Sequence, residues 1–129
     1  MIYVDSSSVL AQLLAEDRFP EPAFWREGPF VSSRLLEYEV WNRVNARGLG
    51  TSHGDDARLL LGRLAFLELV PFVLGRALEP FRTPVRTLDA LHLASIEWLR
   101  GLGQRPMLAT YDRRLADVAT SLDVPLVTL

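Results

Sequence analysis

The sequence predicts an α/β protein, a three-layer α/β/α sandwich around a central, mostly parallel sheet. Short β-favouring apolar runs alternate along the chain with longer segments of helical pattern. The strand runs are apolar throughout, which is typical of strands that helices cover on both faces. With 129 residues, nearly half of them hydrophobic, we expect one domain spanning residues 1–129, because the chain is too short for two ordinary domains.

The first half of the chain predicts two strand–helix pairs. Residues 2–5 form a strand run, and the serines that follow it are good N-caps for a helix over 9–16. Three prolines and a glycine interrupt the segment 19–29, which we expect to be a loop. A second strand is expected at 30–33, and a second helix at 35–48 ends on a glycine.

The second half continues the alternation. A helix is expected over 55–67 and a strand over 67–73, with Pro71 near the end of that strand. Connecting structure then leads to Thr87, a candidate N-cap for an apolar helix over 88–103. The chain closes with a strand, a helix and a final strand, expected at 106–110, 111–123 and 124–129.

The composition excludes several kinds of chemistry. All fourteen basic residues are arginines, so mechanisms that need a lysine (P-loop phosphate binding, Schiff bases, lysine-assisted aspartyl phosphorylation) are excluded. No cysteine is present, which excludes disulfides, thiolate metal sites and cysteine nucleophiles. The net charge of −2 provides no overall attraction to nucleic acid. A nucleic-acid substrate would therefore need local arginines or metal ions to offset its phosphates.

The N-terminal segment does not have the pattern of a targeting sequence. It begins MIYVDSSSVL, without a basic start or a long apolar stretch, and no run approaches the roughly 18 apolar residues of a membrane span. We therefore expect a cytoplasmic protein.

Two aspartates follow predicted strands directly. Asp5 ends the strand run 2–5, and Asp112 comes just after the run 106–110. Ligand sites of parallel sheets lie outside the carboxyl ends of the strands, so both carboxylates are candidates for a site at one edge. An acid at this place also caps the helix that follows, and that simpler interpretation remains open for each aspartate.

Asp89 begins an otherwise apolar helix, where a carboxylate needs a partner because burying an unpaired charge is costly. A metal ion is one such partner, and an arginine such as Arg86 is another. His92 lies three residues further on and shares this face, although we favour a hydrogen-bonded packing role for it. Glu39 lies within the second expected helix, where a solvated charge is the simpler interpretation.

Four segments, taken in order, carry a family resemblance. They are Asp5-Ser6-Ser7 after the first strand, V-S-S-R-L-L-E-Y-E-V with Glu39 near its close, T-L-D-A-L-H-L-A with Asp89, and A-T-Y-D-R-R-L-A with Asp112. The series resembles PIN-domain nucleases, and most of all the VapC-type toxin ribonucleases of bacterial and archaeal toxin–antitoxin pairs. The resemblance extends over essentially the whole chain, and its most specific parts are the Asp89 and Asp112 segments.

The resemblance implies an RNA-hydrolysing site with Mg²⁺ or Mn²⁺ held by Asp5, Glu39, Asp89 and Asp112. Asp5 and Asp89 are expected as direct ligands, and the other two bind directly, through water or at a second metal. Such a cation neutralises phosphoryl oxygens and activates water, and carboxylates suit it. Glu39 is preferred over the nearby Glu37 because it stands directly before an apolar valine, as the family's acid does.

Further residues are expected on the substrate side of the site, and the resemblance also implies partners. Thr110 matches a hydroxyl residue near the fourth acid, while Arg34, Arg113 and Arg114 are candidates for phosphate contacts, with ordinary solvated arginines as the alternative. A homodimer and a small antitoxin partner that blocks the acidic site are implied. Candidate anchors for such interfaces are the three aromatic residues Phe24, Trp25 and Trp41, and we favour core packing for at least one of them.

Two other functions remain alternatives. An aspartate-based phosphohydrolase or receiver on a similar sheet would need a lysine, and a phosphatase of the haloacid-dehalogenase type would also need Asp-x-Asp where Asp5 is followed by two serines. A PIN-like module that binds RNA or protein without hydrolysis is the second alternative.

Overall fold

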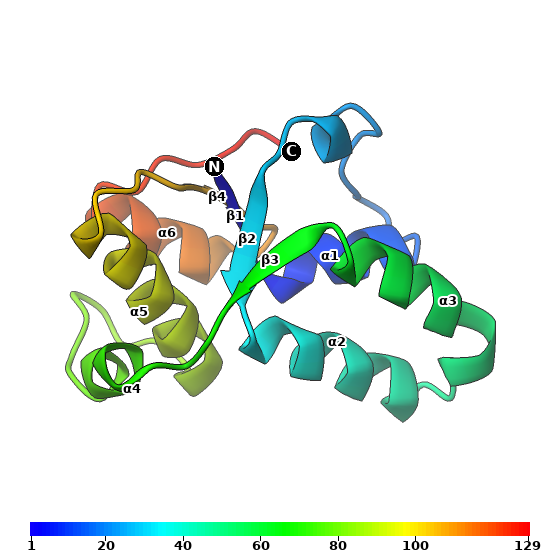
Figure 1. Cartoon of the computed structure of the whole chain (residues 1–129), viewed down its shortest axis with the longest axis horizontal. Helices are drawn as coiled ribbons and strands as arrows, with labels where there is room; N and C mark the ends of the chain where they lie inside the picture. Colours follow the sequence, from blue (N-terminus) through cyan, green and yellow to red (C-terminus); the bar gives the residue numbers. More distant parts are fainter.

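A computed structural model describes residues 1–129, and a four-stranded parallel sheet lies at its centre with helices on both faces (Figure 1). The strand order is β3-β2-β1-β4, which places the first strand between the second and the last. The strands are β1 (Ile2–Val4), β2 (Phe30–Ser33), β3 (Leu64–Leu67) and β4 (Met107–Ala109). Every pairing is parallel, so all four carboxyl ends lie at the same edge.

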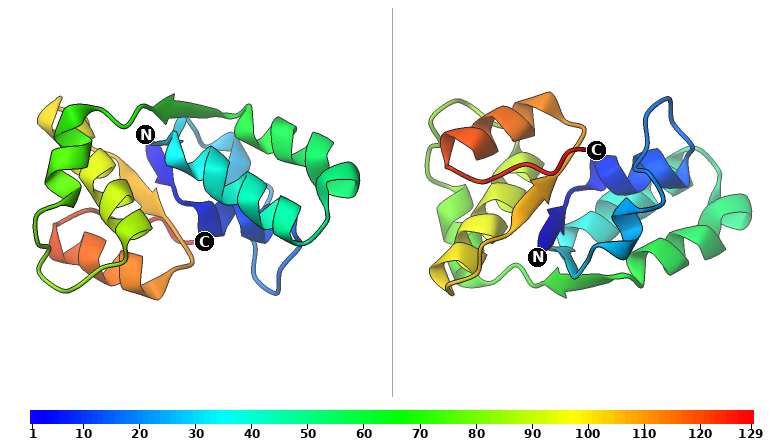
Figure 2. Two further views of the ribbon diagram at one scale, coloured as in Figure 1. Left: turned by 90° about the horizontal axis from the view of Figure 1, so that it is seen from below. Right: turned by 90° about the horizontal axis from the view of Figure 1, so that it is seen from above.

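The helices form two outer layers, seen on opposite sides of the sheet in Figure 2. They are α1 (Ser6–Leu13), α2 (Leu35–Ala46), α3 (Gly50–Leu61), α4 (Pro71–Ala77), α5 (Thr87–Gly101) and α6 (Arg113–Ser121), with a short 3₁₀ helix at Phe24–Arg26. Along β1, Ile2 and Val4 pack with α1, α2 and α3, while Tyr3 packs with α5 and α6. Alternate residues of a strand point to opposite faces, so this short apolar strand supplies two cores. The predicted α/β/α sandwich is confirmed, and its sheet is parallel throughout.

The region 50–77 differs from the sequence-based expectation. The third helix begins at Gly50 rather than 55, and β3 covers Leu64–Leu67 instead of 67–73. Gly50 to Gly54 has the composition of a turn, but Gly54 is buried with Ala57 and Leu61 on one helical face. Tertiary packing of this face therefore extends the helix beyond its local propensity.

Three further boundaries also differ from the sequence-based expectation: the start of α4, the start of α5 and the expected final strand. Pro71 begins helix α4 instead of ending a strand, which fits because the first position of a helix needs no backbone N–H. Thr87 is the first residue of α5, and Arg86 occupies the N-cap position. The final strand expected at 124–129 is reduced to a single parallel bridge between Leu108 and Leu126.

The aromatic residues proposed as interface anchors belong largely to the core. Phe24 and Trp25 are buried, and their rings pack against Phe30 with centroid distances of 5.2 and 5.5 Å. Trp41 is partly buried against the same core, and the Arg58 guanidinium lies over its ring, 5.3 Å from the ring centroid. Core packing of at least one of these aromatics is thus confirmed, and an interface role for Phe24 and Trp25 is wrong, because the loop between α1 and β2 folds back onto the sheet layer.

No helix combines the length and apolar character that crossing a membrane requires.

A candidate active site at the carboxyl edge of the sheet

The four predicted acids line one cleft of about 430 Å³ at the carboxyl edge of the sheet. Asp5 follows β1, Asp112 follows β4, Asp89 lies in the first turn of α5, and Glu39 lies on α2. Other polar residues that line the cleft are Ser6, Ser7, Glu16, Arg43, Arg86, Thr87 and His92. Residues separated by more than one hundred positions in the sequence are thus brought to one place.

Asp5 is buried and held by hydroxyl groups on both carboxylate oxygens. Ser7 Oγ donates to Oδ1 and Thr110 Oγ1 donates to Oδ2, each at 2.7 Å. The backbone N–H of Ser8 also donates to Oδ1 at 3.4 Å, so Asp5 is the N-cap of α1 as well. Burial raises the pKa of Asp5, and the hydrogen bonds from Ser7 and Thr110 oppose that rise. The capping and ligand interpretations of Asp5 are therefore compatible.

Thr110 connects the β4 side of the cleft with the start of α1. Its hydroxyl accepts from the backbone N–H of Asp112 at 2.9 Å and lies 3.2 Å from Ser7 Oγ. Ser7 Oγ in turn accepts from the backbone N–H of Tyr111 at 2.9 Å. These bonds fix the spacing between Asp5 and the turn that carries Asp112. The two hydroxyl residues beside Asp5 in the sequence, Ser6 and Ser7, were expected only as helix caps.

Glu39 faces the cleft and Glu37 does not. Ser6 Oγ donates to Glu39 Oε2 at 3.0 Å, and His92 Nε2 lies 2.6 Å from Glu39 Oε1. Glu37 forms an ion pair with Arg34, which also pairs with Glu68 at 2.7 Å. The side chain of Glu39 is 14% exposed against 32% for Glu37. The preferred glutamate is thus the one that lies with the other acids.

Asp89 and Asp112 share the guanidinium of Arg86. Arg86 Nη2 donates to Asp112 Oδ2 at 2.7 Å, and Arg86 Nε donates to Asp89 Oδ2 at 3.3 Å. Burial raises the pKa of Asp89, the charge of Asp112 adds to the rise, and Arg86 opposes it. The negative charge of Asp89 in turn raises the pKa of Arg86. An arginine was one of the two partners expected for Asp89, and here it occupies that place.

The arginines predicted on the substrate side are outside the cleft lining. Arg34 is engaged by Glu37 and Glu68, while Arg113 and Arg114 are exposed at the start of α6. Arg43 lines the cleft instead, a position that the sequence-based reasoning missed. Its spacing of four residues from Glu39 was the available signal, because residues i and i+4 lie on the same helix face.

Comparison with known proteins agrees with this geometry. A profile of the PIN domain family matches residues 2–121, and Ribonuclease VapC46 of Mycobacterium tuberculosis H37Rv is 35% identical, over 98% of this chain and 95% of the relative. This chain belongs to the VapC ribonucleases of the PIN-domain family. Ribonuclease VapC47 of M. tuberculosis CDC 1551 is 31% identical, over 89% of this chain and 87% of the relative. Ribonuclease VapC35 of the same species is 26% identical, over 98% and 96%.

The donor chemistry of this VapC-type cleft fits a hard divalent cation. All four acids offer carboxylate oxygens, which Mg²⁺ and Mn²⁺ prefer. No group of three or more acidic or histidine side chains is already gathered closely enough to hold a metal ion. The positive charge that now lies between two of the acids is the Arg86 guanidinium, which bridges Asp89 and Asp112. Burial raises the pKa of both Asp5 and Asp89, because it disfavours their ionised forms. A cation bound beside them would stabilise those ionised forms.

We predict that Arg86→Ala tightens the binding of Mn²⁺ to this cleft several-fold, because Arg86 and the metal compete for Asp89 and Asp112. The measurement is the rise in melting temperature during a Mn²⁺ titration of the purified protein. Arg105→Ala is the matched control, since Arg105 is exposed and outside the cleft lining. Equal Mn²⁺ affinity in wild type and Arg86→Ala would show that the metal does not use these two carboxylates.

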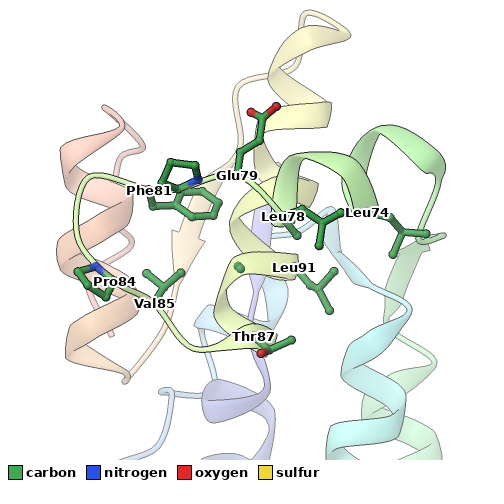
Figure 3. A pocket seen from close by; sticks show the side chains of 11 residues that line it. Leu74, Leu78, Glu79, Phe81, Pro84, Val85, Thr87 and Leu91 are labelled. Carbon is green, nitrogen blue, oxygen red and sulfur yellow. The ribbon is translucent and has the colours of Figure 1, made fainter.

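A second cavity, of about 660 Å³, lies between α4, α5 and the segment joining them. Figure 3 shows Leu74, Leu78 and Leu91 on one side of it, with Phe81 and Val85 on the other. Its lining is mostly apolar, and its one charged lining residue is Glu79. It thus lacks the acidic groups of the first cleft and offers no comparable chemistry.

Proposed function

We propose that this chain is a metal-dependent endoribonuclease and the toxin of a toxin–antitoxin pair. The observation that carries the proposal is that Asp5, Glu39, Asp89 and Asp112 line one cleft in a member of the VapC ribonucleases. RNA is the substrate, since the relatives are named ribonucleases. An enzyme that cuts cellular RNA acts in the cytoplasm, and we assign the chain to that compartment.

The four carboxylates are assigned as the residues that hold Mg²⁺ or Mn²⁺. Asp5 is assigned as a direct ligand, because the hydroxyls of Ser7 and Thr110 fix its orientation and Oδ2, whose one donor is Thr110, keeps a lone pair for a cation. When bound, the cation supplies charge neutralisation at the phosphate and activation of the attacking water. Asp89 and Asp112 become available to it when Arg86 moves away from their shared site.

Arg43 is assigned to hold a phosphate of the RNA. It lines the cleft, its side chain is solvent-exposed, and it lies one helical turn from Glu39. A guanidinium in this place offsets the repulsion between the acids and the RNA backbone. Arg113 and Arg114, exposed beside Asp112, are proposed to contact neighbouring phosphates. Thr110 is assigned an indirect role, since its hydroxyl donates to Asp5.

We further propose an antitoxin partner and a homodimer, as the family resemblance implies. A protein contact is supported by the surface of α4, where the large apolar side chains Phe72, Leu74 and Leu78 are exposed next to the second cavity. Contiguous apolar side chains on a protein surface often mark a site of protein–protein contact.

The proposal predicts RNA cleavage that requires a divalent cation. Purified protein should cut RNA in Mg²⁺ or Mn²⁺, stop in excess EDTA, and resume when the cation is restored, because the carboxylates alone repel the phosphate. The products should be followed on denaturing gels, and the 5′ ends sequenced to define the cut sites. Undiminished cleavage in EDTA would contradict the assigned role of the acids. Mn²⁺ binding without any cleavage would favour a non-catalytic module.

A further inference from the structure

A line of hydrogen bonds runs from the middle of the sheet to the acidic cleft. The backbone N–H of Ser33 on β2 donates to the Tyr3 hydroxyl at 3.2 Å. The same hydroxyl lies 2.7 Å from His92 Nδ1, and His92 Nε2 lies 2.6 Å from Glu39 Oε1. Four elements, β2, β1, α5 and α2, contribute one group each. The line therefore ends on one of the proposed ligands.

The interior part of this line is shielded from water. Tyr3 is fully buried and His92 is 1% exposed, and their rings are perpendicular with centroids 5.7 Å apart. Every buried side-chain polar atom of the protein has a hydrogen-bond partner. Buried polar groups are costly unless they are paired, and a paired network in a low-dielectric interior holds its members in one arrangement. Packing alone would be served by an apolar residue, such as the Leu91 and Leu93 beside His92.

The groups on either side of His92 indicate which of its ring nitrogens carries the proton. The Tyr3 oxygen already accepts from Ser33, and its own hydrogen is free to be donated to Nδ1. Burial raises the pKa of the Tyr3 hydroxyl above its usual value, so this hydrogen is present at neutral pH. The Glu39 carboxylate has no hydrogen to donate, so the bond to Oε1 places the hydrogen of the neutral imidazole on Nε2, and Nδ1 then accepts from Tyr3. Nε2 then donates to Glu39 Oε1.

We propose that His92 is a positioning residue for Glu39, oriented by Tyr3 and donating from Nε2 to Glu39 Oε1. The inference rests on the proposed function, because it takes Glu39 as a metal ligand. With Ser6 donating to Oε2, both oxygens of Glu39 are held by hydrogen bonds, and its side chain lines the cleft. Groups that orient a ligating carboxylate in this way contribute about 10- to 100-fold to metal affinity or activity.

The position of the proton can be measured directly. The protein has two histidines, so long-range ¹H–¹⁵N spectra of the metal-free protein show the imidazole signals of only two rings. His53, which is partly exposed on α3, serves as the reference for the signals of His92. We expect a protonated Nε2 and an unprotonated Nδ1 for His92. Tyr3→Phe removes the donor to Nδ1 and should shift the ¹⁵N resonance of that nitrogen, while Nε2 stays protonated because Glu39 still accepts from it. An unprotonated Nε2 in the wild-type protein would overturn the inference.

Substitution separates a donor role from a packing role. His92→Leu keeps an apolar side chain of similar bulk, and His92→Gln places an amide N–H close to the position of Nε2. We expect His92→Leu to lose about 10- to 100-fold in Mn²⁺ affinity and in RNA cleavage, and His92→Gln to recover most of both. Melting curves without metal show whether each variant folds. His53→Gln, outside the cleft, is the control.

Two results would overturn the inference while leaving the proposed function intact. The first is wild-type Mn²⁺ affinity and cleavage in His92→Leu, and the second is an equal loss in the Leu and Gln variants. If His92→Leu does not fold, the spectra of the wild-type protein and of Tyr3→Phe still test the inference, because they report directly whether Nε2 of His92 carries the proton. Failure of the wild-type protein to bind Mn²⁺ or cut RNA would instead contradict the proposed function, and the spectra would still report whether His92 donates to Glu39.

Discussion

Asp5→Asn is expected to abolish metal-dependent RNA cleavage and to raise the melting temperature of the metal-free protein at neutral pH. The amide keeps the size of the side chain but removes the charge that a hard cation needs. Metal stabilisation of a phosphoryl transition state amounts to several kcal/mol, so cleavage should fall by more than about a hundredfold. Cleavage rates in Mn²⁺ and melting curves in EDTA measure the two effects.

The stability gain has a definite pH dependence. Burial raises the pKa of Asp5, so the folded protein binds this proton more tightly than the unfolded chain does. The contribution of Asp5 to stability is therefore greatest below its unfolded pKa, near 4, and is lost as pH rises through the folded value. The difference in melting temperature between Asp5→Asn and wild type should thus shrink on acidification from neutral pH.

Asp117→Asn is the matched control for this prediction. Asp117 is exposed on α6 and outside the cleft lining, so its substitution should change neither cleavage nor the pH profile. In cells, wild-type protein without its antitoxin should arrest growth, and Asp5→Asn at equal protein levels should relieve the arrest. Arrest that persists in Asp5→Asn would separate toxicity from this cleft.

Glu39→Gln should lose most metal-dependent cleavage, while Glu37→Gln should remain within a few-fold of wild type. On a helix the two residues lie about 200° apart, from about 100° per residue, so only one faces the cleft. Glu39 receives the donors Ser6 and His92, and Glu37 pairs with Arg34. The charge at Glu39 is what a hard cation requires, whereas Arg34 keeps Glu68 as a partner when Glu37 is neutral.

The pair of variants is its own control, since each changes one glutamate of α2 to its amide. Cleavage rates and melting curves with and without Mn²⁺ should be measured on both. Glu39→Gln should lose most of the Mn²⁺ stabilisation, and its metal-free melting temperature should equal or exceed that of wild type, because a charge near Asp5 and Asp89 is removed. An inactive Glu37→Gln together with an active Glu39→Gln would mean that the ligand is misassigned.

The fold class and the placement of two acids could be predicted because they depend on local sequence. Asp5 and Asp112 each follow a short apolar run that pairs as a strand, and parallel strands place their carboxyl ends at one edge. The alternation of strand and helix patterns likewise predicted the layers. The local sequence pattern predicted the wrong element boundaries between residues 50 and 77. There the buried face of α3 and the proline at the first position of α4 determine where the helices begin.

The sequence by itself therefore determined the alternation of strands and helices and the position of Asp5 and Asp112 at the carboxyl ends of strands, since each follows from adjacent residues. Only the tertiary structure decided which face of α2 meets α5, and hence that Glu39 rather than Glu37 lies beside His92. The same holds for Arg86, whose contact with Asp112 joins residues 26 positions apart. Such contacts depend on how helices pack across the sheet, which no spacing within one segment specifies.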